Sequence, residues 1–128
     1  MPVWLEKREV LYFYSELLGE HGGLAGPPNE DAIESTLARP RNRLAYQPSC
    51  SIYELAAAYG FGFSQNHCFP DGNKRLALVT IDVFLQANGY ELQVEEAEAV
   101  VVIRAVAAGE LSEQELATWV ESHSVSLE

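Results

Sequence analysis

The sequence predicts an all-α fold, a single domain over residues 1–128 with about six helices. Three observations support this prediction. Apolar residues recur at helical spacing along most of the chain. Ser-x-x-Glu capping boxes, which mark a helix N-terminus, occur at Ser51–Glu54 and at Ser112–Glu115. Glycines follow several of the apolar stretches, at the position where helices commonly end.

The first two helices are delimited by glycine, proline and a capping side chain. The first is expected over Val3–Leu18 with Gly19 as its stop, and the Gly- and Pro-rich stretch HGGLAGPPN then forms a loop. Asn29 is the expected N-cap of the second helix, over Glu30–Ala38. Arg39-Pro40 is expected to end it, so that the segment up to Ser49 is irregular or a short hairpin.

The second half of the chain contains the four remaining predicted helices. The helix that Ser51 opens is apolar on nearly all sides in LAAAYGFGF, which predicts a buried central helix. Gly89 and Gly109 are expected to end the fourth and fifth helices. In chain order the predicted ranges are Ser51–Asn66, Asn73–Asn88, a connector over Tyr90–Val94, Glu95–Ala108 and Ser112–Ser122.

The formal net charge of −11 argues against a nucleic-acid-binding or membrane-surface protein. No apolar run approaches the ~20 residues that cross a bilayer, and the N-terminus lacks the pattern of a signal peptide. Two cysteines, Cys50 and Cys68, favour reduced thiols in a cytosolic protein over a disulfide. The few basic residues concentrate in RPRNR and NKR, which suggests a site for a small anion on an acidic body.

The stretch HCFPDGNKR, residues 67–75, joins two apolar helices by a tight turn. It places Lys74 and Arg75 in the first turn of a helix, where the helix dipole repels cations. A phosphate bound at that helix end would be held by free backbone N–H groups and neutralised by both cations, and Gly72 would let the turn form a nest of N–H groups. Tolerated, solvated surface charges explain the same pattern about equally well, because each costs only ~0.3–1 kcal/mol.

Three further residues of the turn suggest phosphate chemistry. A neutral His67 can take a proton from a hydroxyl, although a histidine at a helix C-terminus is more often a capping partner. Asp71 can hold Mg²⁺, although Asp is also common in turns. Phe69 is expected to point into the core and fix the loop.

These residues resemble the signature of the Fic/Doc superfamily. The pattern H-x-F-x-[DN]-[GA]-N-[KG]-R is matched by HCFPDGNKR. The family's N-terminal pattern is similar to EHGGLAGPPNEDAIESTLARPRNRLAY, and the end of its central helix to FLQANGYEL. The resemblance covers most of the chain and is closest to the Doc (death-on-curing) branch, the toxins of bacterial toxin–antitoxin pairs. Cys68 departs from the proline common at that position, which tolerates change.

The resemblance implies an all-helical Fic fold that transfers part of ATP, with Mg²⁺, to a protein hydroxyl. Most Fic enzymes transfer AMP and have Gly where this chain has Lys74. Doc-type proteins have Lys there, which is held to reverse the nucleotide so that the γ-phosphate is transferred to Ser or Thr. The target class implied is the translation factor elongation factor Tu, with growth arrest in the bacterial cytoplasm as the outcome.

The resemblance also assigns roles by matching position. The catalytic residues would be His67 as general base, Asp71 as the Mg²⁺ ligand, and Lys74 and Arg75 at the phosphates. The nucleotide would be bound by Gly72, Asn73, Lys74 and Arg75. Leu44, Ala45 and Tyr46 would form the flap that aligns the target peptide by strand addition. Arg39 to Arg43 would assist there or be a solvated basic turn.

Inhibition is expected in trans. Self-inhibited relatives carry an [ST]-x-x-x-E-[GN] helix, of which only Ser124 and Glu128 match the first part here. The resemblance therefore implies a Phd-like antitoxin that folds on binding, with Trp4, Leu11 and Tyr12 either at that interface or in the core. Three alternatives stay open from the sequence: AMP transfer on the same fold, a non-catalytic nucleotide- or peptide-binding module, and, against the charge, a DNA-binding helical domain.

Overall fold

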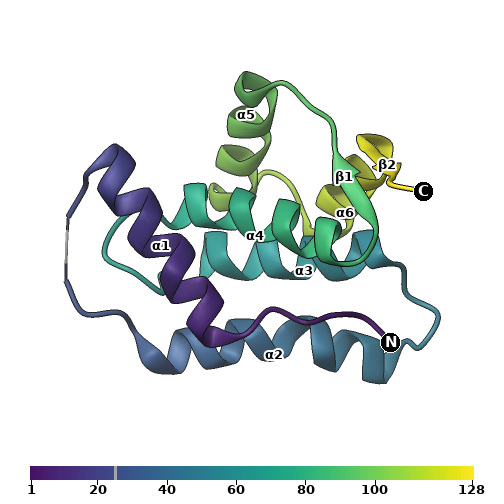
Figure 1. Cartoon of the computed structure of the whole chain (residues 1–128), viewed down its shortest axis with the longest axis horizontal. Coiled ribbons are helices and arrows are strands. Elements are labelled where there is room, and N and C mark those ends of the chain that lie inside the picture. The colour runs from purple at the N-terminus through teal and green to yellow at the C-terminus, as the bar shows by residue number, and fades with distance from the viewer. Residues whose placement is uncertain (25) are drawn as a thin grey trace.

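The computed structural model describes residues 1–24 and 26–128; Ala25, part of the predicted loop HGGLAGPPN, lies outside the described residues. Six helices and two short strands form the described part (Figure 1), which confirms the predicted all-α class. The elements are α1 Lys7–His21, α2 Glu30–Tyr46, α3 Ile52–Gln65, α4 Asn73–Ala87, β1 Tyr90–Leu92, α5 Glu96–Ala107, α6 Glu113–Ser122 and β2 Ser124–Ser126.

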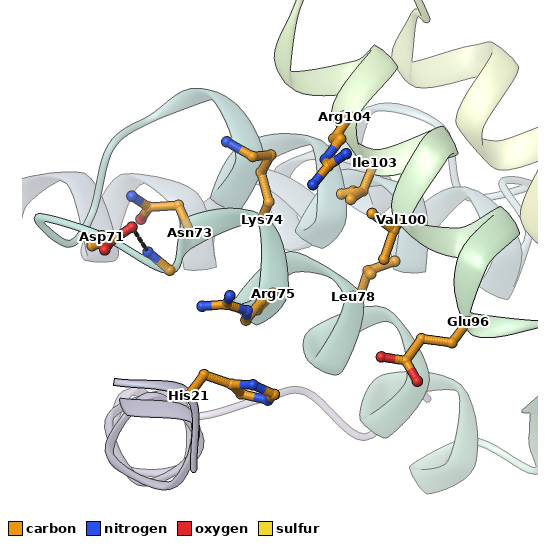
Figure 2. A pocket seen from close by; sticks show the side chains of 11 residues that line it. His21, Asp71, Asn73, Lys74, Arg75, Leu78, Glu96, Val100, Ile103 and Arg104 are labelled. Atoms are coloured by element: carbon orange, nitrogen blue, oxygen red, sulfur yellow. Dashed lines mark hydrogen bonds between the residues drawn. The ribbon is translucent and has the colours of Figure 1, made fainter. Parts of the chain in front are cut away.

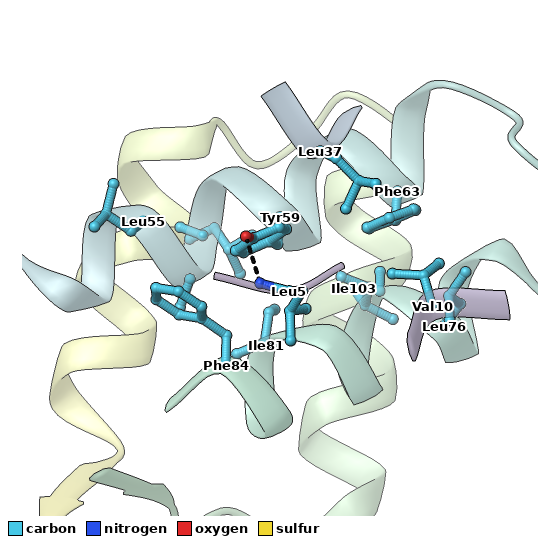
Figure 3. Packing of buried hydrophobic residues seen from close by; sticks show 14 of the residues in the cluster. Leu5, Val10, Leu37, Leu55, Tyr59, Phe63, Leu76, Ile81, Phe84 and Ile103 are labelled. Atoms are coloured by element: carbon cyan, nitrogen blue, oxygen red, sulfur yellow. Dashed lines mark hydrogen bonds between the residues drawn. The ribbon is translucent and has the colours of Figure 1, made fainter. Parts of the chain in front are cut away.

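Helix α3 lies at the centre of the fold, in contact with α2, α4, α5 and α6. Small residues on this helix let its neighbours approach closely. At Gly60, a Cβ atom would overlap the side chain of Ile81 on α4. The hydroxyl of the buried Tyr59 accepts a 3.1 Å hydrogen bond from the amide of Leu5, so α3 also fixes the N-terminal segment (Figure 3). The predicted buried central helix is confirmed.

The predicted helix caps are also confirmed. Ser51 Oγ accepts from the amide of Glu54 at 3.1 Å, while Glu54 Oε1 accepts from the amide of Ser51 at 3.0 Å. The same reciprocal pair joins Ser112 and Glu115 at the start of α6. Asn29 caps α2 by accepting from the third amide of that helix. These local bonds satisfy backbone donors that a helix start leaves free.

The predicted bounds of the first helix were wrong at both ends. Val3 lies in an extended segment, where the side chain of Asn88 bonds to both its amide and its carbonyl group. Helix α1 then begins at Lys7 and continues through Gly19 to His21. A glycine inside a helix costs only about 1 kcal/mol, so it does not have to end one. Gly22, with φ of 69°, ends the helix instead.

Helix α2 does not end at Arg39-Pro40, as the sequence predicted. It continues through the buried Pro40 to Tyr46, so residues 41–46 are helical rather than irregular or a hairpin. Ion pairs flank the proline: Arg39 pairs with Glu113 of α6, and Arg43 pairs with both Glu113 and Glu54. The packing of α2 on α3 and these ion pairs act together against a local penalty of about 3 kcal/mol. The basic cluster is therefore an inter-helix link and not a solvated turn.

Strands β1 and β2 form a small antiparallel sheet that the sequence did not predict. Glu91 is paired with Val125. Strand β1 lies within the predicted connector, and β2 follows α6 directly. Each strand has three residues, too few to show an alternating pattern.

Candidate active site

The segment between α3 and α4 is held in place by side chains of α1 and α4 and by a backbone hydrogen bond from the residue before α2. Asn73, the first residue of α4, accepts from the amide of Phe69 at 3.1 Å and donates to its carbonyl oxygen at 2.8 Å. The ring of the buried Phe69 stacks on Tyr14 of α1, with centroids 3.8 Å apart. The amide of Asn29, the N-cap of α2, donates to the carbonyl of Cys68 at 2.7 Å. Phe69 thus anchors the loop, as the sequence predicted.

His67 has an unusual backbone conformation. Its φ is 49°, the left-handed region, and it is the one non-glycine residue among those described with a positive φ. Such a conformation costs about 1–2 kcal/mol for a residue with a Cβ. The turn leaves the His67 side chain exposed, directly before the buried Cys68 and Phe69. A strained, exposed histidine beside a tightly held loop is typical of a functional position.

The start of α4 presents free amide groups. Gly72, the N-cap, has φ of 81° in the left-handed region, and the first α4 amide bonded to a backbone carbonyl is that of Leu76, to Gly72. Among the described residues, no acceptor takes the amides of Asn73, Lys74 or Arg75. Three free donors at the positive end of a helix dipole form an anion site.

A cavity of about 380 Å³ opens at this helix start (Figure 2). Its walls come from the end of α1, the start of α4 and one side of α5. Lys74 and Arg75 line it, and Arg104 reaches it from α5. The lining residues are His21, Asp71, Gly72, Asn73, Lys74, Arg75, Leu78, Glu96, Val100, Ile103 and Arg104. The volume lies within the range of about 300–1,000 Å³ common for small-molecule sites.

Among the described residues, the lysine and arginine cations of the cavity form no ion pair, although Asp71 and Glu96 line the same cavity. Within the described part of the chain, the four basic residues Lys7, Arg8, Arg39 and Arg43 form ion pairs with carboxylates. No such pair involves Lys74, Arg75 or Arg104. The three cations Lys74, Arg75 and Arg104 outnumber the two carboxylates of this cavity, although the chain has a net charge of −11. This local excess of positive charge indicates an anionic ligand.

Asp71 brings a fixed negative charge to the edge of this cavity. Its Oδ2 accepts from the amide of Leu24 at 3.3 Å, and its Oδ1 from the amide of Gly72 at 2.8 Å. These two bonds, in that order, hold the pKa of Asp71 below its ordinary value, with a smaller contribution from the charges of Arg75 and Lys74. The carboxylate is therefore ionised at neutral pH, and each oxygen keeps a lone pair for a hard cation such as Mg²⁺.

The loop before α2 packs on the same turn, which the sequence did not predict. Besides the bond from Leu24, an added Cβ at Gly23 would lie 2.9 Å from Asp71 Oδ2, and one at Gly26 would lie 3.1 Å from the ring of Pro70. Gly23 has φ of 124°, so it meets both a conformational and a spatial requirement for glycine. This loop therefore holds the carboxylate of Asp71 in position.

A second hollow, of about 450 Å³, continues from the cavity between α1, α4 and α5. Its additional lining is largely apolar and includes Leu17, Val79 and Val94. Arg75 and Glu96 line both hollows. The charged hollow and the more apolar one together form a cleft that is charged at one end and largely apolar at the other.

The structure brings together most of the predicted site residues. Asp71, Gly72, Asn73, Lys74 and Arg75 all line the cavity, whereas His67 and Phe69 do not. The side chain of Asn73 is engaged by Phe69, so only its backbone N–H is free for an anion.

Two cavity residues with basic side chains were not among the predicted site residues, because they come from elsewhere in the chain. His21 is the last residue of α1 and lines the cavity. Arg104 has an ordinary helical context in the sequence, and only the packing of α5 on α4 places it at the site.

The proposed flap residues Leu44, Ala45 and Tyr46 form the last turn of α2 and line neither hollow. The start of α2 is bonded to the 67–75 loop, and in Figure 1 the helix runs away from that loop. The prediction that these three residues form a strand-like flap is therefore wrong, because they are helical. The segment beside the site is the loop before α2.

Cys68 has no reactive environment. Burial raises the pKa of its thiol, which lies 3.6 Å from Thr36 Oγ1.

None of the helices in the described residues has the length and apolar character needed to cross a membrane.

The model of the Fic/DOC family matches residues 4–85, which include α1, α2, α3, the 67–75 loop and most of α4. The chain belongs to the Fic/DOC family. It is also similar to "Protein kinase doc" of Escherichia phage P1, with 28% identity over 88 residues, 69% of this chain and 70% of that protein. Arg104 lies outside the part that the Fic/DOC family model matches.

Proposed function

We propose that this chain is a Doc-type toxin that transfers the γ-phosphate of ATP to a Ser or Thr hydroxyl of a translation factor, with elongation factor Tu as the expected target. The observation that carries the proposal is the cavity at the start of α4, where three free amides lie beside three cations that form no ion pair and beside the ionised Asp71. Support comes from Lys74, which occupies the position that distinguishes Doc-type proteins, and from similarity to a relative named a protein kinase.

The residues present fit a bound Mg²⁺·ATP. The amides of residues 73–75 and the side chains of Lys74, Arg75 and Arg104 would bind phosphate oxygens. Asp71 would bind Mg²⁺, since its carboxylate is ionised and fixed by two amides. The metal ion would supply charge neutralisation at the phosphates. The apolar hollow along Leu17 and Val79 would accommodate the nucleoside.

His67 would accept the proton of the attacking hydroxyl. Its exposed side chain lies at the surface, where a hydroxyl of a protein substrate can reach it, rather than in the cavity wall. The fold supplies what phosphoryl transfer mainly requires, which is positioning and neutralisation of charge. Removal of a general base is expected to slow the reaction by ~10²–10⁴-fold.

Restraint in trans by a Phd-like antitoxin completes the proposal. Ser124, which matches the first position of the [ST]-x-x-x-E-[GN] motif, lies in β2 rather than in a helix. Of the three residues suggested for an antitoxin interface, Tyr12 is 61% exposed, while Trp4 and Leu11 pack against the core. The bacterial cytoplasm, where translation factors are found, is the expected compartment.

The experiment is a transfer assay with purified elongation factor Tu and either [γ-³²P]ATP or [α-³²P]ATP. The proposal expects label from the γ position only, and loss of that label with His67→Ala. Label from the α position only would establish AMP transfer in its place. Growth arrest that persists in the His67→Ala and Asp71→Ala variants, without any label, would identify a non-catalytic binding module. Intact-mass analysis of translation factors from arrested cells tests the choice of target.

A further inference from the structure

The hydroxyl of Tyr14 has no hydrogen-bond partner although it is buried. The side chain belongs to α1 and is 9% exposed, and its Oη finds no partner among the described residues. An unsatisfied buried hydroxyl costs about 1–3 kcal/mol, so native proteins rarely leave one without a role. Its counterpart Tyr59, also buried, accepts from the amide of Leu5.

The hydroxyl end of Tyr14 lies under the proposed active-site turn. Its ring stacks on Phe69 at 3.8 Å, with an interplanar angle of 14°. Its Cε1 atom, next to the carbon that bears the hydroxyl, would be 3.5 Å from a Cβ at Gly72. Burial first, and then the negative charge of Asp71, raise the pKa of Tyr14. A tyrosine hydroxyl is protonated at neutral pH and can donate a hydrogen bond.

A small cavity lies between Tyr14 and the residues of the proposed active-site turn that line it, Asp71 and Gly72. It measures about 10 Å³ and is lined by Tyr14, Leu17, Leu18, Gly22, Asp71, Gly72 and Arg75. A cavity must reach about 10–15 Å³ to hold one water molecule, so this one is just large enough. The lining residues with polar side chains are Tyr14, Asp71 and Arg75. Each Asp71 oxygen uses one lone pair for an amide and keeps another.

We propose that Tyr14 is a positioning residue for Asp71: its hydroxyl donates, through one water molecule in this cavity, to the carboxylate and holds it from below. The bond joins α1 to the turn at the residue that would bind Mg²⁺, so its significance for catalysis rests on the proposed function. Outer partners of this kind commonly change metal affinity by about 10–100-fold. The link itself is a property of the folded chain without any ligand.

A double-mutant cycle between Tyr14→Phe and Asp71→Ala, read by urea unfolding, tests the link. We expect Tyr14→Phe to lower the folding equilibrium constant about fivefold in the parent and to have little effect in the Asp71→Ala background. Tyr59→Phe is the control for loss of a buried, bonded hydroxyl, and Tyr12→Phe is the control for an exposed one on the same helix. Unchanged or increased stability of Tyr14→Phe would overturn the proposal, as would an equal loss in both backgrounds.

Calorimetry separates this inference from the proposed function. In the parent and in Tyr14→Phe, ATP binding is measured over a range of Mg²⁺ concentrations and in EDTA. A positioning role predicts about a tenfold higher half-saturating Mg²⁺ concentration in Tyr14→Phe and unchanged binding in EDTA. An equal half-saturating concentration in the two proteins would exclude the role toward the metal. If the parent binds no Mg²⁺·ATP, the proposed function fails, while coupling in the cycle would still establish the link.

Discussion

Replacement of Asn73 by alanine tests whether the active-site loop is held as the structure shows. The side-chain amide of Asn73 forms both an acceptor bond to the Phe69 amide and a donor bond to the Phe69 carbonyl, at 3.1 and 2.8 Å. Alanine removes both bonds and leaves the backbone amide and carbonyl of Phe69, a residue that is 4% exposed, without these partners. The variant reports on the loop geometry rather than on the binding of an anion.

The expected loss of stability is about 2–3 kcal/mol. A hydrogen bond contributes a net ~1 kcal/mol, so the two bonds contribute ~2 kcal/mol, and an unpaired buried amide adds to this when water cannot reach it. For a domain of this size, the loss corresponds to a fall in Tm of roughly 8–12 °C. Asn73→Asp keeps the acceptor and places a negative charge at a helix N-terminus, so it should lose only about 1 kcal/mol.

Urea unfolding followed by circular dichroism measures these differences. Gln86→Ala is the matched control, because Gln86 also lies on α4 and also forms a side-chain bond, but an exposed one to Asp82. We expect this control to stay within ~0.5 kcal/mol of the parent. If Asn73→Ala is as stable as Gln86→Ala, the loop is not held by Asn73 and the argument for its geometry is wrong.

Three other predictions concern packing, charge and pH. Gly60→Ala should lower the unfolding free energy by about 1–3 kcal/mol because the added methyl group would overlap Ile81. A second substitution, Ile81→Val, makes room for this methyl group and should restore part of the lost free energy in denaturant unfolding. Arg104→Ala should weaken ATP binding about fivefold in calorimetry at low salt and less at high salt, with Tm unchanged, whereas Arg8→Ala should not. The pKa of Asp71 is lowered in the folded state, so the stability that its ionised form contributes is fully present above the ordinary pKa of 3.8 and is lost as the pH falls through the folded pKa. The difference in unfolding free energy between the parent and Asp71→Asn is measured by urea unfolding from pH 2 to pH 6. This difference should be constant at the upper end of the pH range and shrink at the lower end. A difference that grew toward acid would contradict the assignment of the Leu24 and Gly72 bonds.

The sequence predicted those parts of the fold that depend on neighbouring residues. The caps at Asn29, Ser51 and Ser112 were correct because each is a bond between residues three positions apart. Pro40 misled the prediction because distant contacts oppose its local cost: α2 packs on α3, and its arginines pair with Glu113, at least 70 residues further along the chain. Strand pairing between residues 90–92 and 124–126 is likewise a distant contact that short segments do not reveal.

In the candidate site, too, the residues that are neighbours in the sequence could be predicted and the distant ones could not. The residues from Asp71 to Arg75 could be found because they are contiguous and their types suit a phosphate. Arg104 and His21 could not, since no local pattern distinguishes them and only the packing of α1 and α5 around α4 places them at the cavity. The flap was assigned to residues 44–46, but the loop that contacts Asp71 includes Gly23 and Leu24.

Calorimetric titration of Mg²⁺·ATP into the purified chain tests most directly whether the start of α4 is a triphosphate site. We expect saturable one-to-one binding in the parent and at least tenfold weaker binding when Lys74 and Arg75 are both replaced by alanine, with folding intact. No heat of binding in the parent, or equal affinity in the double variant, would contradict the account.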